Sequence, residues 1–149
     1  MEKIRQARME DAARIAEIEI FNYRMNFYPI FKSDWFYFEE LQVPQQMERY
    51  QANPALIENT LVYDDGVVKG FIRVKDGEVE KLFVEPVLQG KSIGAELLEY
   101  AIQIKQANYL WALEKNARAI AFYQRHGFSL TGEKKLEEDT TEYLVRMQR

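Results

Sequence analysis

The sequence predicts an α/β domain in which a mixed, mostly antiparallel sheet is flanked by helices, in the order β-α-α-β-β-β-α-β-α-β. Three observations lead to this prediction. The chain has 149 residues without a Gly/Ser-rich or Pro-rich linker, which fits a single domain over residues 1–149. Apolar residues make up 47% of it, enough for a buried core. Segments of helical periodicity alternate with short strand-like segments.

The first half of the chain is expected to open with a short strand within residues 3–8 and a helix from Glu10. Acidic residues in the first helical turn favour this start, because the helix dipole attracts negative charge there. A second helix is expected within residues 39–51. The first helix is indicated by apolar residues that recur every three or four positions: Ile15, Ile18, Phe21, Met25 and Tyr28.

The middle of the chain is expected to form three strands, at residues 60–63, 67–75 and 78–85. In the second of these, apolar and charged residues alternate, which is typical of a strand with one solvated face. Asp76 and Gly77 then predict a hairpin turn, because glycine tolerates the positive φ that such turns require.

The last third is expected to contain two helices and two strands. Residues 90–106 predict a helix, 109–113 a short apolar strand, and 117–125 a helix that Gly127 closes. Residues 141–147 predict the final strand.

The composition excludes several classes of protein. The chain has no cysteine, and His126 is its single histidine, so a disulfide scaffold, a thiolate metal site and a His-rich metal cluster are excluded. The net charge of −4 argues against a nucleic-acid partner. No apolar run approaches the length of a membrane helix, and no secretory signal is visible. We therefore expect a cytoplasmic protein with no metal and no membrane partner.

The most informative segment lies at residues 82–101, where a strand ends at Pro86 and a helix follows a short loop with Gly90 and Gly94. Backbone N–H groups and the positive end of a helix dipole suit a phosphate or pyrophosphate. An ordinary strand-to-helix loop is an equally good interpretation from spacing alone. Neither the Walker A nor the dinucleotide-binding spacing fits.

This loop, Gln89-Gly90-Lys91-Ser92-Ile93-Gly94, resembles the acyl-CoA loop Q/R-x-x-G-x-G/A of the GNAT (Gcn5-related) N-acetyltransferases. Ser92 replaces the middle glycine of that pattern, and serine fits if its φ is negative. A second segment is similar to the family's N-x-x-A-x-x-F-Y-x-x-x-G-F pattern. It carries Asn116, Ala119, Phe122, Tyr123, Gly127 and Phe128 at the matching positions. The close resemblance covers residues 79–128.

The resemblance implies an acetyl-CoA site. The pantetheine arm would contact the main chain of Leu82, Phe83 and Val84. The pyrophosphate would contact the backbone amides of Gln89, Gly90, Lys91, Ser92, Ile93, Gly94 and Ala95. Lys91 adds a charge toward a phosphate or is simply a solvated lysine. Asn116 would contact the pantetheine, cap a helix, or do both. Tyr123 would protonate the departing thiolate, the alternative being a packing tyrosine.

The general base does not follow from the resemblance. Glu80 is the local candidate and Glu78 the alternate, and either is equally well explained as a solvated strand acid. His126 follows the end of a helix, where a cation merely complements the dipole, so it is not expected to be the base.

Residues 21–38 are unusually aromatic, with nine of the 20 aromatic residues of the chain. Because the first two helices of GNAT folds wall the acceptor pocket, this segment is a candidate acceptor site. Arg24 would bind an acceptor carboxylate there, and Tyr28 would line the pocket. The alternatives are a core beneath the first helix and a dimer interface.

These observations predict an enzyme that transfers an acetyl group from acetyl-CoA directly to an amine of a small molecule or peptide. A backbone N–H near Val84 would polarise the thioester carbonyl. The alternative is a non-catalytic acyl-CoA-binding or sensory module on the same fold, which Ser92 motivates. A homodimer formed through sheet edges is possible.

Overall fold

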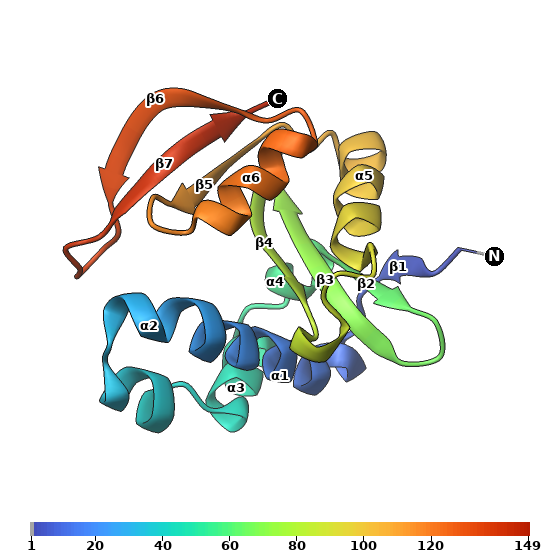
Figure 1. The fold of residues 1–149 in the computed structure, drawn as a ribbon. Helices are drawn as coiled ribbons and strands as arrows, with labels where there is room; N and C mark the ends of the chain where they lie inside the picture. Colours follow the sequence, from blue (N-terminus) through green and yellow to red (C-terminus); the bar gives the residue numbers. More distant parts are fainter. Residues whose placement is uncertain (1) are drawn as a thin grey trace.

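A seven-stranded sheet of strand order β1-β2-β3-β4-β5-β7-β6 forms the centre of the computed structural model, which describes residues 2–149 (Figure 1). Neighbouring strands are antiparallel, except for the parallel pair β4 and β5. The predicted fold class is therefore confirmed. The strands are β1 (Ile4–Gln6), β2 (Thr60–Asp64), β3 (Val68–Lys75), β4 (Glu78–Val84), β5 (Tyr109–Leu113), β6 (Ser129–Leu136) and β7 (Tyr143–Gln148).

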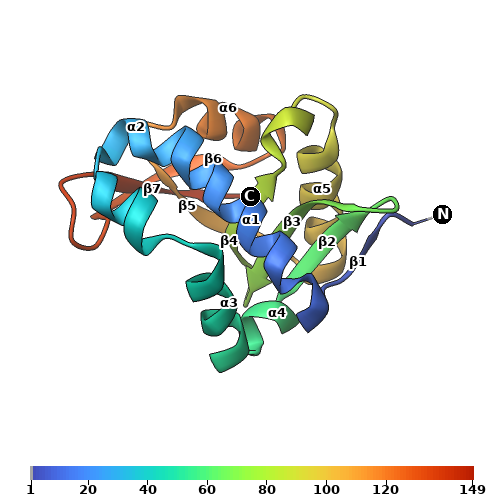
Figure 2. The same cartoon turned by 90° about the horizontal axis from the view of Figure 1, so that it is seen from below.

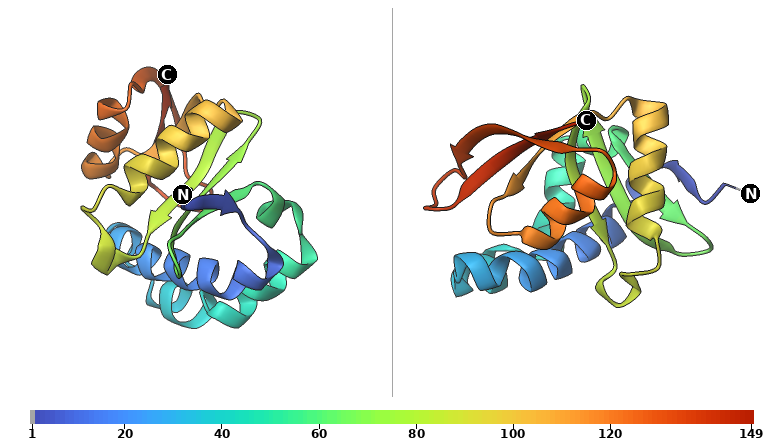
Figure 3. Two further views of the ribbon diagram at one scale, coloured as in Figure 1. Left: turned by 90° about the vertical axis from the view of Figure 1, so that its right-hand side faces the viewer. Right: turned by 45° about the horizontal axis from the view of Figure 1, so that its top comes forward.

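Helices cover both faces of the sheet. Figure 3 shows α1 and α5 on opposite sides of strands β2–β4, and Figure 2 shows α1 running across the sheet. A π-helical turn at Tyr23–Phe27 joins α1 to α2, and a second π-helical segment spans Trp35–Glu40. The helices are α1 (Ala12–Asn22), α2 (Tyr28–Phe31), α3 (Val43–Ala52), α4 (Ala55–Glu58), α5 (Ile93–Lys105) and α6 (Ala117–Arg125).

The central strands supply two cores, because alternate side chains of a strand point to opposite faces. Leu61 and Ile72 belong to the core beneath α5, which also holds Leu97. Their neighbours Val62 and Phe71 belong to the core beneath α1. Burying such a side chain contributes about 1.5–3 kcal/mol relative to leaving it exposed. The alternation of apolar and charged residues in β3 predicted one solvated face, and this prediction was wrong. Both faces of β3 are largely buried.

Strand β6 and the short helices α2 and α4 are not among the elements expected from the sequence. Strand β6 is exposed along its whole length. It pairs with β7 at its two ends, and the register shifts between Leu130 and Lys134. Helix α2 contains Pro29 but is not broken by it, because proline in a first helical turn removes no intrahelical hydrogen bond.

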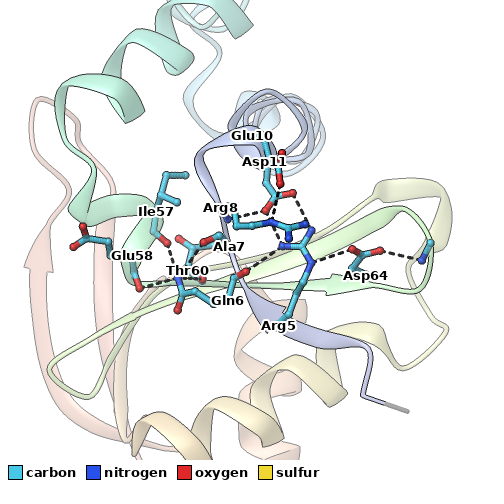
Figure 4. Close-up of polar contacts among 11 residues, drawn as sticks. Arg5, Gln6, Ala7, Arg8, Glu10, Asp11, Ile57, Glu58, Thr60 and Asp64 are labelled. Atoms are coloured by element: carbon cyan, nitrogen blue, oxygen red, sulfur yellow. Dashed lines mark hydrogen bonds and ion pairs between the residues drawn. The ribbon is translucent and has the colours of Figure 1, made fainter.

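A cluster of polar contacts connects β1 with β2 and with the start of α1 (Figure 4). The Arg5 guanidinium donates to Asp64 Oδ2 at 3.0 Å and to both carboxylate oxygens of Asp11, at 2.9 and 3.0 Å. The backbone N–H of Arg8 donates to Asp11 Oδ2 at 2.8 Å. These hydrogen bonds, that from Arg5 foremost, lower the pKa of the Asp11 carboxyl. The cluster therefore fixes where α1 begins relative to β1 and β2.

Candidate active site

A cleft opens in the sheet where β4 and β5 diverge. The two strands pair only at Glu78 with Tyr109 and at Val79 with Leu110, near their first residues. Beyond these pairs they separate, as Figure 1 shows, and the cleft between them has a volume of about 680 Å³. The sheet therefore leaves one backbone edge of β4 free of β5 over 80–84.

The cleft wall formed by β4 and α5 contains most of the residues assigned to the cofactor. Ten of them line it: Leu82, Phe83, Val84, Gln89, Gly90, Ser92, Ile93, Gly94, Ala95 and, from the start of α6, Asn116. Lys91 is exposed and does not line it. Ile93, Gly94 and Ala95, the first residues of α5, line this end of the cleft, and the first N–H groups of an α-helix have no partner within the helix.

The loop before α5 bends through two left-handed residues. Gly90 has a φ of +85° and Ser92 a φ of +68°. The condition under which serine fits, a negative φ, is not met, because Ser92 takes the conformation that glycine prefers. The loop keeps the turn that leads into the N-terminus of α5 despite this substitution.

Asn22 is a site residue that the sequence analysis missed. Its buried Nδ2 donates to the carbonyl oxygens of Ile18, at 2.8 Å, and Val84, at 2.9 Å. Its Oδ1 accepts from Gln89 Nε2 at 3.1 Å. Asn22 therefore holds the end of β4 and the loop before α5 against α1. No sequence signal marks its role in the site, since Val84 and Gln89 lie more than 60 positions away along the chain.

Helix α6 brings Asn116 and Tyr123 to the cleft. Asn116 Oδ1 accepts from the backbone N–H of Ala119 at 3.1 Å, which is a helix cap. Asn116 also lines the cleft, so the two interpretations given above are compatible. Burial raises the pKa of the Tyr123 phenol, which therefore keeps its proton at neutral pH. Among residues 2–149, none forms a hydrogen bond with the Tyr123 hydroxyl within the usual distance.

Glu80 lies at a bulge in β4. Arg73 pairs with Lys81 and Val74 with Val79, so Glu80 is the extra residue between them. Its side chain lines the cleft, whereas that of Glu78 does not. Within the described part of the chain, no hydrogen bond or ion pair engages the Glu80 carboxylate. It is therefore free to accept a proton from a group in the cleft.

The aromatic segment divides between the cleft and a small core. Tyr23, Phe27 and Phe31 line the cleft. The buried Tyr37 packs with Tyr28 in the core beside it, and burial together with the charge of Glu137 raises the pKa of Tyr37 to about 12. Part of the segment thus lines the cleft and part forms a core beside it, and an acceptor role for the cleft-lining rings stays a prediction.

The two residues proposed for acceptor binding do not line the cleft. Arg24 Nε donates to the carbonyl oxygen of Tyr37 at 3.0 Å, and the guanidinium lies 5.3 Å from the Phe38 ring centroid. Tyr28 contacts the Asp34 carboxylate through its hydroxyl. Both side chains thus hold the aromatic segment together, and the expectation that they face the acceptor does not fit their contacts.

His126 lines the cleft, with its Nδ1 2.7 Å from Glu99 Oε1. No group of three or more histidine, cysteine, aspartate or glutamate residues within 2–149 is arranged to bind a metal ion. None of the helices in this part of the chain combines the length and the apolar character needed to span a bilayer.

A splayed pair of parallel strands, with a helix N-terminus at its mouth and a tyrosine in its wall, defines the class of acyl-transferring GNAT folds. The family model described as the acetyltransferase (GNAT) domain matches residues 57–130. Residues 57–130 therefore form a GNAT acetyltransferase domain.

Similar proteins include two curated relatives and a solved structure. The chain is 29% identical over 77 residues to the peptidyl-lysine N-acetyltransferase YjaB of Salmonella typhimurium, covering 52% of this chain and 53% of that protein. It is 32% identical over 89 residues to the peptidyl-lysine N-acetyltransferase YiaC of Escherichia coli, covering 59% of each. The chain thus spans little more than half of these relatives. The structure of yncA from Salmonella typhimurium, solved with its cofactor acetyl-CoA, has a TM-score of 0.65 at 26% identity and covers 98% and 91% of the two chains.

Proposed function

We propose that this protein is an N-acetyltransferase that takes the acetyl group of acetyl-CoA and transfers it directly to an amine of a small molecule or peptide. The cleft beside the free edge of β4 carries this proposal. It has room for an extended ligand arm, main-chain groups along 82–84 to pair with the arm, and a helix N-terminus suited to a pyrophosphate. The relatives named above, which acetylate peptidyl-lysine, support an amine acceptor.

Three features of the cleft take part in the proposed reaction: the main chain near Val84, the Glu80 carboxylate and the Tyr123 hydroxyl. Acetyl-CoA, when bound, supplies an activated thioester. The main chain near Val84 orients the carbonyl and polarises it through an N–H group. The Glu80 carboxylate takes the proton of the acceptor ammonium, directly or through water, so that the amine attacks as a neutral nucleophile. As the C–S bond breaks, the Tyr123 hydroxyl donates its proton to the departing thiolate and recovers one, through water, from the nitrogen that becomes the amide.

Titration calorimetry tests the cofactor assignment. Acetyl-CoA and free CoA are expected to bind in the micromolar range, about −8 kcal/mol, whereas an adenine nucleotide without the pantetheine arm binds much more weakly. Equal binding of all three would contradict a pantetheine site along β4. If none of the three ligands binds, the proposed function is overturned.

Tyr123→Phe tests the enzymatic reading against that of a non-catalytic acyl-CoA module. We expect the amine-dependent release of CoA to fall by roughly 10²-fold or more, the size of general acid catalysis, with unchanged acetyl-CoA affinity. Tyr143→Phe, on the exposed start of β7, is the matched control and should keep full activity. No release of CoA by the unaltered protein with a broad panel of amines would favour the binding module.

A further inference from the structure

A buried charged network lies behind the wall of the cleft that faces α1. Glu19, on α1, is 1% exposed and Arg73, on β3, is 2% exposed. Glu19 Oε1 accepts from the Tyr50 hydroxyl at 2.6 Å, and Arg73 Nη2 donates to the same hydroxyl at 3.0 Å. On its other side, Glu19 Oε2 accepts from Lys81 Nζ at 2.5 Å. The network therefore connects a fully buried arginine to a lysine on β4.

The network carries more positive than negative charge. Within residues 2–149, Glu19 is the one carboxylate within ion-pair distance of Lys81, and none lies within that distance of Arg73. Two cations thus share one anion, and both Glu19 and Arg73 are buried away from water. Charges there are weakly screened, so the excess positive charge acts strongly on a nearby group.

Lys81 is the member of the network that reaches the cleft. Its side chain is 20% exposed and lines the cleft beside Tyr23. An ammonium has three N–H donors, and the Glu19 carboxylate and the Tyr23 hydroxyl engage two of them. One donor is left for a group in the cleft.

The cleft also contains negative charge. Glu80 lines it from the bulge of β4, and Glu137 lines it from the end of β6. A purely anionic acceptor would be repelled by these carboxylates, whereas a purely cationic one would be repelled by Lys81. An acceptor that carries both an amine and a carboxylate offers a positive group to the carboxylates of the cleft and a negative group to Lys81.

We propose that Lys81 binds a carboxylate carried by the acceptor, so that the preferred substrates are amines that also bear a carboxylate. Glu19, Tyr50 and Arg73 act as positioning residues that hold the Lys81 ammonium at the cleft. The carboxylate belongs either to a free amino acid or to an acidic side chain beside a reactive lysine. This inference rests on the proposed acetyltransferase function and specifies its acceptor.

Matched acceptor pairs test the proposal and separate the two sources. In one arm, each of several amino acids is compared with its carboxamide. In the other, short peptides with glutamate beside a single lysine are compared with the same peptides carrying glutamine. The measured quantity is a ratio within each pair: the kcat/KM of the acceptor that bears the carboxylate, divided by the kcat/KM of its amide counterpart. Because an amide lowers the pKa of a neighbouring amine, the ratio is compared between protein variants, where this difference cancels.

Lys81→Met is expected to lower the ratio in one arm by roughly tenfold or more, the effect of losing one charge-assisted hydrogen bond. Lys81→Arg should keep most of the preference, because it keeps the charge. Lys75→Met, which removes an exposed lysine of β3, is the matched control and should leave both kcat/KM values unchanged. The arm in which the ratio falls identifies the source of the carboxylate.

Lys81→Met leaves the buried Glu19 without its ammonium partner, so the double variant Glu19→Gln, Lys81→Met is included. It removes the whole ion pair and keeps the net charge of the network, with Arg73 as its remaining cation. Folding of both variants is checked by urea denaturation. An equal loss of kcat/KM for both members of every pair, in the single and the double variant, would overturn the acceptor proposal alone. Absence of turnover of all amines by the unaltered protein would overturn the acetyltransferase function with it.

Discussion

Ser92 occupies the position at which the acyl-CoA loop pattern has glycine, and its φ of +68° costs it conformational energy. A left-handed conformation with a Cβ costs roughly 1–2 kcal/mol, whereas glycine loses about 0.5–1 kcal/mol more backbone entropy on folding. We therefore expect Ser92→Gly to raise the free energy of unfolding by about 0.5–1 kcal/mol in urea denaturation. Ser92→Ala, which keeps the Cβ, should give no such gain. A Ser92→Gly variant less stable than the unaltered protein would contradict this account.

Residue spacing predicted some site residues and missed others for a physical reason. Gln89, Gly94 and Tyr123 fall within short local patterns, and the structure brings all three to the cleft. Lys81 and its partner Glu19 are 62 positions apart, so no local pattern connects them. Arg24 was assigned to the acceptor by its charge, whereas the backbone carbonyls of Tyr37 and Leu41 accept hydrogen bonds from its guanidinium.

At the scale of elements, Asp11 ties the start of α1 to β1 and β2. Because its folded-state pKa lies below its ordinary value, its contribution is complete above the unfolded-state pKa of about 3.9 and disappears as the pH falls through the folded-state value. We expect Asp11→Asn to lower the free energy of unfolding at pH 7 by roughly 1–3 kcal/mol.

The difference between the unaltered protein and Asp11→Asn should shrink as urea denaturation is repeated from pH 7 down to pH 3. Asp65→Asn is the matched control. Its carboxylate also pairs with a cation, Lys69, but at the exposed surface, where solvent screens the pair. A pH-independent loss in Asp11→Asn would mean that the aspartate acts by packing and not through its charge.

Elements that bury one face show a periodic pattern of apolar residues, so they could be predicted from the sequence. Elements without a buried face show no such pattern and could not be predicted. Helix α5 and strand β3 carry apolar residues at regular spacing, and both appear in the structure near their expected bounds. Strand β6, with the sequence SLTGEKKL, buries no residue and owes its strand conformation to pairing with β7. Such a strand leaves no hydrophobic signal in its own sequence.

At the scale of the whole molecule, two residue pairs between β4 and β5 join the two halves of the sheet, and the cleft lies beside them. A ligand in this cleft binds the folded protein alone, so acetyl-CoA at 100 times its Kd should add about 2.7 kcal/mol of stability. We expect the Tm to rise by roughly 5–10 °C. Hydrogen exchange should show new protection of the amides at 80–84, and a Tm unaffected by acetyl-CoA would contradict a cleft that binds it.

Strand β6 has a consequence for the protein in concentrated solution. Its pairing with β7 is interrupted at Gly132, where φ is +91°, and Lys134 and Lys135 follow this interruption. The opposite edge strand, β1, has only three residues. An edge that is kinked and charged, or very short, is a poor template for further strands. Open-ended addition of copies into fibrils is therefore disfavoured at both margins of the sheet.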